Sequence, residues 1–194
     1  GAIAEKEWKL PDLHGFLDYR AGARFEQDAH TDDITLNELR LQLEINKGYK
    51  HATIQMKSDF IYDDVAGAKR PDLEDGTGWI DLREAYILLY PSIYADIKLG
   101  RQVLTWGAGD LLFINDIFPK DWQAFFIGRD QNYLKAPSDA LMLSLFPGFA
   151  NIDLAYMPRF DSSRYVSGRR ISLWNPMQGG ITGDSAVIRP AEND

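Results

Sequence analysis

The chain has 194 residues, of which 45% are hydrophobic and 26% charged, and its formal net charge is −8. Nucleic acid is a poor partner for such an acidic chain, because a phosphate backbone requires a basic surface. Cysteine is missing from the sequence, which excludes disulfides, thiol nucleophiles and thiolate metal ligands. No stretch reaches the roughly 18 consecutive apolar residues that a membrane-spanning helix needs.

Alternation of apolar and polar side chains is the main signal along the chain. Residues 39–46 alternate strictly, and residues 52–60 follow nearly the same pattern. A period of two predicts β-strands with one apolar and one polar face. After a leader at 1–11, the pattern predicts strands at 13–25, 34–46, 51–62, 79–90, 94–106, 139–146 and 149–157, with weaker candidates at 170–174 and 181–189.

The connections between these strands alternate between short and long. Turns at 46–50, 90–94 and 147–149 alternate with longer connections at 27–33, 63–78 and 107–138. This asymmetry is typical of outer-membrane barrels, and strands of about 10 residues suit a tilted membrane crossing. The sequence therefore predicts a single all-β domain over residues 1–194, an antiparallel up-and-down transmembrane β-barrel.

Aromatic residues gather near the ends of the predicted strands. They are Tyr49, Phe60, Tyr62, Trp79, Tyr90, Tyr94, Trp106, Phe146 and Phe149. Alternation alone does not say which face points outward, and turn-flanking aromatics on a soluble core are the alternative. Two interfacial girdles would produce this placement, because amphipathic rings favour the headgroup region of a bilayer. The aromatic pattern therefore favours the membrane barrel.

The predicted polar face carries six acids and six bases. Eight of them are candidates for the wall of a lumen: Arg40, Glu44, Lys57, Asp59, Asp81, Arg83, Asp96 and Lys98. The other four are Asp18, Arg20, Arg24 and Asp153. A wet lumen tolerates such charges, whereas each unpaired charge would destabilise a dry core by several kcal/mol. The near balance of charge predicts weak charge selectivity through the wall itself.

A hairpin in the middle of the chain carries a resemblance to a known family. Residues 82–87 read Leu-Arg-Glu-Ala-Tyr-Ile, and residues 99–107 read Leu-Gly-Arg-Gln-Val-Leu-Thr-Trp-Gly. This hairpin resembles porin-like outer-membrane barrels of a large uncharacterised family of Gram-negative bacteria, and more distantly alginate-export barrels. The resemblance implies an outer-membrane channel for passive transport of small or amphipathic solutes.

The end of the chain departs from that family, whose members are longer and usually finish on a strand ending in an aromatic residue. Residues 189–194 read Arg-Pro-Ala-Glu-Asn-Asp instead. We therefore expect the N-terminal part of a larger barrel with more than eight strands. A complete eight-stranded barrel, whose narrow interior would be filled by side chains, is the alternative.

The long connection at 107–138 is the third of the long loops, which in general porins folds inward and narrows the pore. Its candidate constriction residues are Asp110, Asp116, Lys120, Asp121, Arg129 and Asp130. Connections of this length are usually functional or disordered, and charges at a constriction filter solutes. The alternative is a short helix or plug that only packs against the wall.

A second group of candidates has a structural role. It consists of Glu84, Gly100, Arg101, Gln102 and Trp106. By simple alternation Arg101 would point to the apolar face, so we expect either a bulge at Gly100 or a change of register there. We also expect Glu84 to pair with a buried Arg83 or Arg101.

No motif in the chain indicates catalysis, a cofactor or a metal. Acidic residues at 63–76 match no calcium loop, and the three histidines lack metal-ligand spacing. Gly183-Asp184-Ser185 resembles the start of a lipase motif, but no histidine lies nearby in sequence. We expect a non-enzyme whose partners are outer-membrane lipid, a small solute and possible further copies or a periplasmic or surface protein. The alternatives are a soluble β-barrel that binds a hydrophobic ligand, and a non-conducting scaffold.

Overall fold

The structure is a computed structural model that describes residues 11–67, 70–105 and 117–184. Its elements in these ranges are β1 (Asp12–Ala23), β2 (Ile34–Gly48), β3 (Ala52–Asp63), β4 (Ile80–Ser92), β5 (Ala95–Gln102), α1 (Trp122–Phe126), a 3-10 helix (Gln131–Tyr133), β6 (Ser138–Leu145), β7 (Ile152–Tyr156), β8 (Leu173–Asn175) and β9 (Gly180–Thr182). No helix among these residues is long and apolar enough to cross a membrane.

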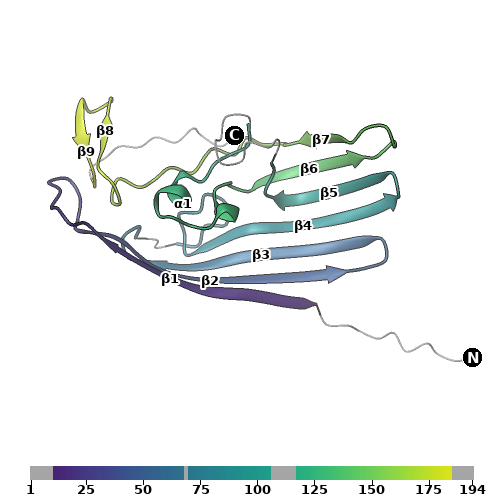
Figure 1. The fold of residues 1–194 in the computed structure, drawn as a ribbon, viewed down its shortest axis with the longest axis horizontal. Helices are drawn as coiled ribbons and strands as arrows, with labels where there is room; N and C mark the ends of the chain where they lie inside the picture. The colour runs from purple at the N-terminus through teal and green to yellow at the C-terminus, as the bar shows by residue number, and fades with distance from the viewer. Residues whose placement is uncertain (1–10, 68–69, 106–116, 185–194) are drawn as a thin grey trace, which may run out of the picture.

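Strands β1 to β7 form one antiparallel sheet, the main sheet, in which each strand pairs with the next one in the chain (Figure 1). The predicted all-β, up-and-down architecture is therefore confirmed. Within the described residues β1 pairs only with β2 and β7 only with β6, so the main sheet does not close on itself there.

The two ends of the main sheet differ in their connections. Short connections at 49–51, 93–94 and 146–151 lie at one end, the turn end. Longer connections at 24–33, 64–79 and 103–137 lie at the other, the loop end (Figure 1). The predicted alternation is confirmed, although the fifth strand stops at Gln102 rather than near residue 106.

The weaker candidates at the end of the chain do not extend the main sheet. Strands β8 and β9 pair only with each other in the described residues, as a separate hairpin at the loop end (Figure 1). The chain leading into this hairpin is held by the β1–β2 connection. Arg24 Nη2 donates to the Arg170 carbonyl at 2.9 Å, and the Ser172 hydroxyl donates to Asp28 at 2.5 Å. The predicted eighth and ninth strands are present in part, as β8 and β9, but they form their own hairpin instead of joining the main sheet. Residues 185–189 lie outside the described ranges.

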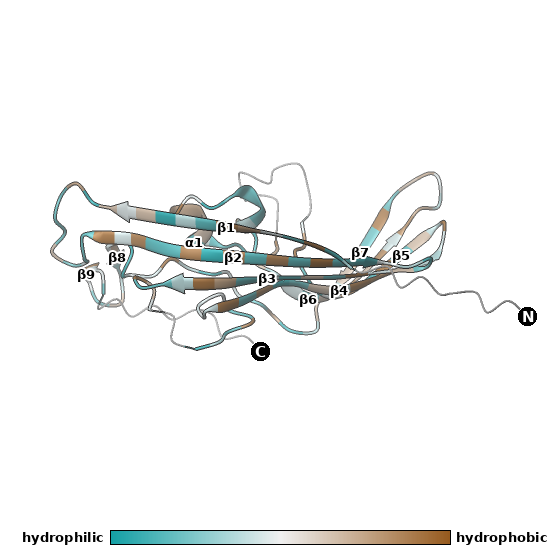
Figure 2. Ribbon diagram, turned by 90° about the horizontal axis from the view of Figure 1, so that it is seen from below, coloured by the Kyte–Doolittle hydropathy of each residue, from teal (hydrophilic) through white to brown (hydrophobic). Residues whose placement is uncertain are grey.

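Alternation in the strands gives the main sheet two different faces, visible as brown and teal bands along β2 in Figure 2. Leu39, Leu41 and Leu43 are between 37% and 40% exposed, whereas Arg40 between them is 2% exposed. The register places like side chains opposite each other, as for Ile45 and Met56. We call these the apolar face and the polar face. The apolar face is the exposed one.

One irregularity changes this alternation in β4. Lys57 pairs with Glu84 and Ser58 with Leu82, which leaves Arg83 as an extra residue in β4. Such a bulge shifts the side-chain alternation by one position. Arg83 and Glu84 therefore both reach the polar face, where Arg83 lies near Asp81 and Glu84 bonds Lys57.

A small apolar cluster joins the long β5–β6 connection to the main sheet. Leu104, Phe118 and Ala140 are buried together, and Met142 and Ala155 pack against them. Met142 lies opposite Lys98, so this cluster is on the polar face. Through this cluster, Leu104 and Phe118 of the connection are held against β6 and β7.

Candidate functional site

Residues 117–137 of the long connection, here called the inward loop, fold over the polar face near the loop end (Figure 1). Local capping gives this loop a defined shape. Asp121 begins α1 by accepting a hydrogen bond from the Ala124 backbone at 2.7 Å, and Asp130 begins the 3-10 helix by accepting from the Asn132 backbone at 3.0 Å. Such side-chain caps satisfy the free N–H groups of a first turn. Local capping therefore defines the two short helices of the inward loop.

Backbone hydrogen bonds then close the inward loop on itself. The Asp121 N–H donates to the Leu134 carbonyl at 2.9 Å, and the Ala136 N–H donates to the Pro119 carbonyl at 3.0 Å. The two ends of the loop thus run side by side, and the residues between them project as one unit over the sheet.

Tyr133, at the end of the 3-10 helix, inserts between two arginines of the sheet. Its ring centre lies 5.0 Å from the guanidinium carbon of Arg40 and 4.9 Å from that of Arg83, within the range of cation–π attraction. Its hydroxyl accepts a hydrogen bond from the Gln42 amide. Burial and the neighbouring Asp59 carboxylate raise the pKa of the Tyr133 phenol, which therefore stays neutral.

Ion pairs fasten the inward loop to the strands beneath it. Arg40 of β2 contacts Glu38 at 3.0 Å and also bonds Asp59 of β3. From the inward loop, Arg129 bonds the second oxygen of Glu38 at 2.5 Å. All four side chains are at most 5% exposed, so each charge depends on its partners.

Arg83, the bulged residue of β4, continues this network. Its Nη2 donates to the carbonyl of Asn132 at 3.2 Å and to that of Lys135 at 2.7 Å, so it holds the loop backbone directly. Its Nη1 lies 3.7 Å from Asp81 and 3.8 Å from Asp121. Arg83 thus contacts both the main sheet and the inward loop.

The segment after β7 supplies two more arginines. Arg164 donates to both oxygens of Asp81 at 2.8 Å and lies 3.4 Å from Asp121, while Arg170 pairs with Asp63. Burial alone would lower the pKa of Arg164, but Asp81 and Asp121 raise it above its ordinary value. Arg164 therefore remains charged and joins three separate segments of the chain.

Nearer the turn end, the polar face carries more exposed pairs. Lys57 lies 3.3 Å from Glu44 and 3.2 Å from Glu84, and Lys98 lies 3.9 Å from the centre of the Tyr86 ring. The register puts Asp96 opposite Ser144. All eight predicted wall residues therefore share one face of the main sheet, as alternation predicts once the bulge at Arg83 is included.

The predicted pairing of Glu84 with Arg83 or Arg101 was wrong. Glu84 bonds Lys57, while Arg83 contacts Asp81 and Asp121. Arg101 lies 3.7 Å from Asp139 on β6. The reason is the bulge, which turns Glu84 toward the polar face while Arg101 stays at a position of apolar-face parity, opposite Ala85.

Both alternatives expected for Arg101 were wrong. The pairing of β5 with β4 and with β6 runs through Gly100 without a shift, so β5 has neither a bulge nor a change of register there. Gly100 has a φ of 124°, and a Cβ there would lie 2.3 Å from the Ala85 carbonyl oxygen. Only glycine fits such a position. Arg101 beyond it is buried, and its guanidinium donates to the Leu82 and Glu74 carbonyls at 2.8 Å each.

The remaining predicted residues differ in where the structure places them. Gln102 is buried and donates to the Ala140 carbonyl at 3.0 Å. Lys120 is also buried and donates to the Phe118 carbonyl at 2.8 Å, whereas Asp130 is exposed. Asp121 and Arg129 are brought together, 3.9 Å apart. The predicted residues outside the described ranges are Trp106, Asp110 and Asp116.

Sequence reasoning missed several central residues: Glu38, Tyr133, Arg164 and Arg170. Glu38 shares the parity of Arg40 in β2, so alternation carried a signal for it. Nothing in the sequence links Arg164 to Asp81, because 83 residues separate them.

Two cavities lie on either side of the inward loop. The outer cavity, of about 810 Å³, lies at the loop end among Asp63, Gly76 and Ser163. The inner cavity, of about 780 Å³, lies over the middle of the strands, among Asp18, Gln42 and Lys57. Arg129 lines both, so the inward loop divides the space over the polar face. In the described part of the chain, no group of three or more histidine or acidic side chains could hold a metal ion.

The chain matches no protein-family model, no curated protein and no solved structure.

Proposed function

We propose that this chain forms part of an outer-membrane, porin-like β-barrel that lets small or amphipathic solutes cross passively. The polar face lines the lumen, the apolar face contacts lipid, and the inward loop narrows the passage. No covalent chemistry and no cofactor are involved.

The observation that carries this proposal is the reversed burial of the two faces. Leu41 is 39% exposed, whereas Arg40 and Asp59 are 2% and 0% exposed. A water-soluble protein buries the apolar face of a sheet and solvates its charges. Lipid reverses that preference, since it favours an apolar outer surface around a polar interior.

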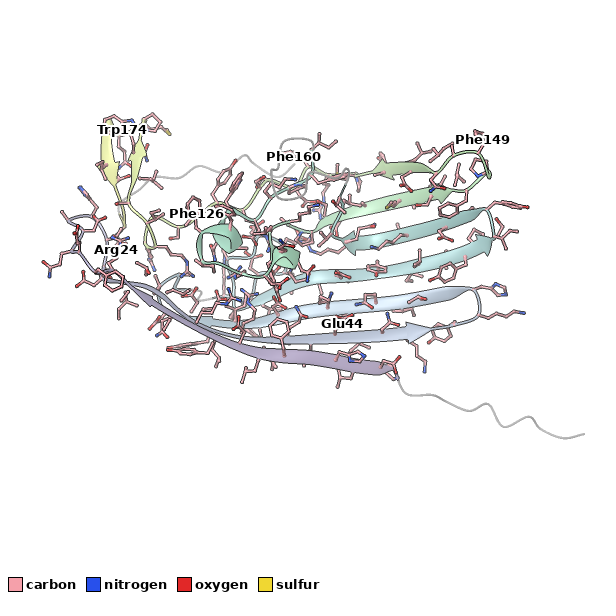
Figure 3. All side chains as sticks on the ribbon, in the orientation of Figure 1. Arg24, Glu44, Phe126, Phe149, Phe160 and Trp174 are labelled. Atoms are coloured by element: carbon pink, nitrogen blue, oxygen red, sulfur yellow. The ribbon has the colours of Figure 1, made fainter. Side chains whose placement is uncertain are left out.

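Strand length and aromatic placement add support. Strands β2, β3 and β4 contain 15, 12 and 13 residues, and a tilted membrane strand needs about 9–11. Tyr94 and Phe149 are exposed at the turn end, where Figure 3 labels Phe149, and Tyr62 is exposed toward the loop end. Two such bands suit the two headgroup regions of a bilayer.

The open edges of β1 and β7 bear on how the barrel is completed. Unpaired backbone groups at a sheet edge are not tolerated in hydrocarbon, so a membrane sheet must close. We infer that further strands join β1 and β7, which gives a barrel larger than the described sheet.

The soluble barrel with a hydrophobic ligand inside requires the opposite arrangement. Its apolar face would line the interior, and Lys57 and Glu44 would lie outside. The inward loop instead covers the polar face, through Arg129, Tyr133 and the apolar cluster around Phe118. This geometry favours the channel.

Single-channel conductance of the complete gene product, refolded into a planar bilayer, tests the proposal. We expect reproducible current steps, and we expect their size to change in the charge-neutral double variant Glu38→Gln/Arg129→Gln, because this pair fastens the inward loop. The control is Arg159→Gln, an arginine whose side chain is 56% exposed. Protein that inserts without conducting would favour a plugged or docking scaffold. Protein that stays monodisperse without detergent would refute the membrane barrel.

A further inference from the structure

The inner and outer cavities differ in the charges that line them. Among the described residues, the bases of the inner cavity are Arg20, Arg40, Lys57, Arg83, Arg129 and Lys135, and its acids are Asp18, Glu84 and Asp130. The outer cavity has the opposite excess: its acids are Glu38, Asp63, Glu74, Asp75, Asp121 and Asp161, and its bases are Arg70, Arg129 and Arg164. The lining therefore changes sign along the strands, from acidic at the loop end to basic beyond the inward loop.

Two arginines of the inner cavity hold donors that the described residues leave without a hydrogen bond. Arg83 Nη1 and Arg129 Nε are both buried, and neither has a hydrogen-bonding partner there. The side chains of Arg83 and Arg129 are 3% and 5% exposed. Arg83 Nη1 lies 3.7 Å from Asp81 and 3.8 Å from Asp121, so these buried guanidiniums contribute positive charge to the cavity wall and are not donors open to a solute.

Two further cations of the inner cavity are more exposed than this buried network. The side chains of Arg20 and Lys57 are 26% and 24% exposed; Arg20 lies 2.6 Å from Asp18, and Lys57 lies 3.3 Å from Glu44 and 3.2 Å from Glu84. The cavity volume of about 780 Å³ lies within the range of about 300–1,000 Å³ found for small-molecule sites. The inner cavity therefore combines an excess of basic over acidic lining residues, two partly exposed cations and room for a small solute.

We propose that the inner cavity is a subsite for small oxyanions, which takes the carboxylate or phosphate group of a solute on the turn-end side of the inward loop. This inference rests on the proposed channel and names the chemistry of its solute. The acidic outer cavity repels the same anion, so the two cavities together make the passage asymmetric for charge.

The test uses two probes, succinate and inorganic phosphate, on the complete gene product. The first readout is reduction of single-channel current in oriented bilayers at low salt. The second is calorimetric binding to the refolded protein in detergent micelles, which needs no conduction. We expect at least one probe to bind. We expect Arg20→Gln/Lys57→Gln to weaken that binding about tenfold or more, because two cations that face the solute are lost.

Two matched variants sharpen this test. Glu84→Gln removes an acid of the inner cavity and should tighten binding of the probe. Arg70→Gln removes a base of the outer cavity and should leave it unchanged. Binding of succinate would show that the subsite takes the carboxylate group of a solute, and binding of phosphate would show that it takes a phosphate group.

The failure of this inference is distinct from failure of the channel. Clear current steps with no response to either probe would overturn the subsite and leave the channel standing. Binding in micelles without any current would support the subsite and refute conduction. Equal binding by the wild type and Arg20→Gln/Lys57→Gln would overturn the subsite in either case.

Discussion

The two faces of the main sheet are built from the same strands but stabilised in different ways. On the apolar face, Leu41 lies between Leu17 and Phe60 of the neighbouring strands, and Leu41 and Leu43 are exposed. On the polar face, Arg40 contacts Glu38, Asp59 and Tyr133, each in a defined geometry. Apolar contact is non-directional, whereas hydrogen bonds and ion pairs are directional. The directional contacts of the polar face therefore determine where the inward loop lies. The exposed side chains of the apolar face determine whether water or lipid suits the outer surface of the sheet.

The largest expected effect comes from removing one buried cation of the polar face. Arg164→Met leaves Asp81 and Asp121 without a main partner, and we expect it to lower the free energy of unfolding by about 3–5 kcal/mol. Denaturant titration in micelles measures this. The control Arg159→Met removes an arginine that is 56% exposed and should change stability by less than about 1 kcal/mol. Equal effects of the two variants would contradict the buried network.

A charge on the apolar face tests which solvent that face meets. In a bilayer, Leu43→Arg should destabilise the protein by about 2–4 kcal/mol, because the charge enters hydrocarbon. The control Asn46→Arg places the same charge on the polar face of the same strand. Unfolding in lipid vesicles compares the two variants. If Leu43→Arg is harmless there, or improves solubility without detergent, the apolar face does not contact lipid.

In β5, Gly100 lies between Leu99, which is exposed on the apolar face, and Arg101, which is buried. Gly100→Ala should destabilise the protein by about 1–3 kcal/mol, since its φ of 124° is strained for any other residue and the new Cβ would meet the Ala85 carbonyl. Gly48→Ala is the control, because a Cβ there has no neighbour within 4 Å. Comparable denaturation midpoints for these two variants would rule out a special role for Gly100.

The smallest expected effect comes from Asp28 and Ser172, which lie in connections at the loop end and not in the strands of the main sheet. The Ser172 hydroxyl and the His30 backbone N–H lower the pKa of Asp28 below its ordinary value. A lowered folded-state pKa adds stability above the unfolded pKa of about 4, and this is lost as the pH falls through the folded value. Ser172→Ala should therefore be less stable than wild type at neutral pH, with the difference vanishing in acid. A difference that stays constant from pH 7 to pH 2 would exclude this linkage.

Local sequence patterns predicted the strands well because alternation and turn residues act over a few positions. Residues 34–46 and 51–62 were predicted as strands, and the structure has β2 at Ile34–Gly48 and β3 at Ala52–Asp63. The run at 170–174 carried an equally local signal, but its chain is tethered to Asp28 and Arg24 and joins the β8–β9 hairpin instead. Strand propensity alone does not determine which sheet a strand joins.

The residues of the candidate site could be predicted only where they lie within the alternating strands. The polar-face residues Arg40, Lys57 and Asp59 were found by parity, since a period of two fixes the face of each residue. The bulge at Arg83 was missed, although two consecutive charged residues in an alternating strand signal such an irregularity. The contacts of Tyr133 join segments far apart in sequence, so no local pattern contains them.

The sequence by itself determined the order of the strands, the alternation of short and long connections, and the separation into an apolar and a polar face. Each of these follows from residue spacing and turn chemistry, which are local. Only the tertiary structure decided that the inward loop covers the polar face, that Arg164 joins Asp81 and Asp121, and that β8 and β9 stand apart from the main sheet. These features depend on which distant side chains can satisfy one another's charges and hydrogen bonds, and that matching exists only once the sheet has formed.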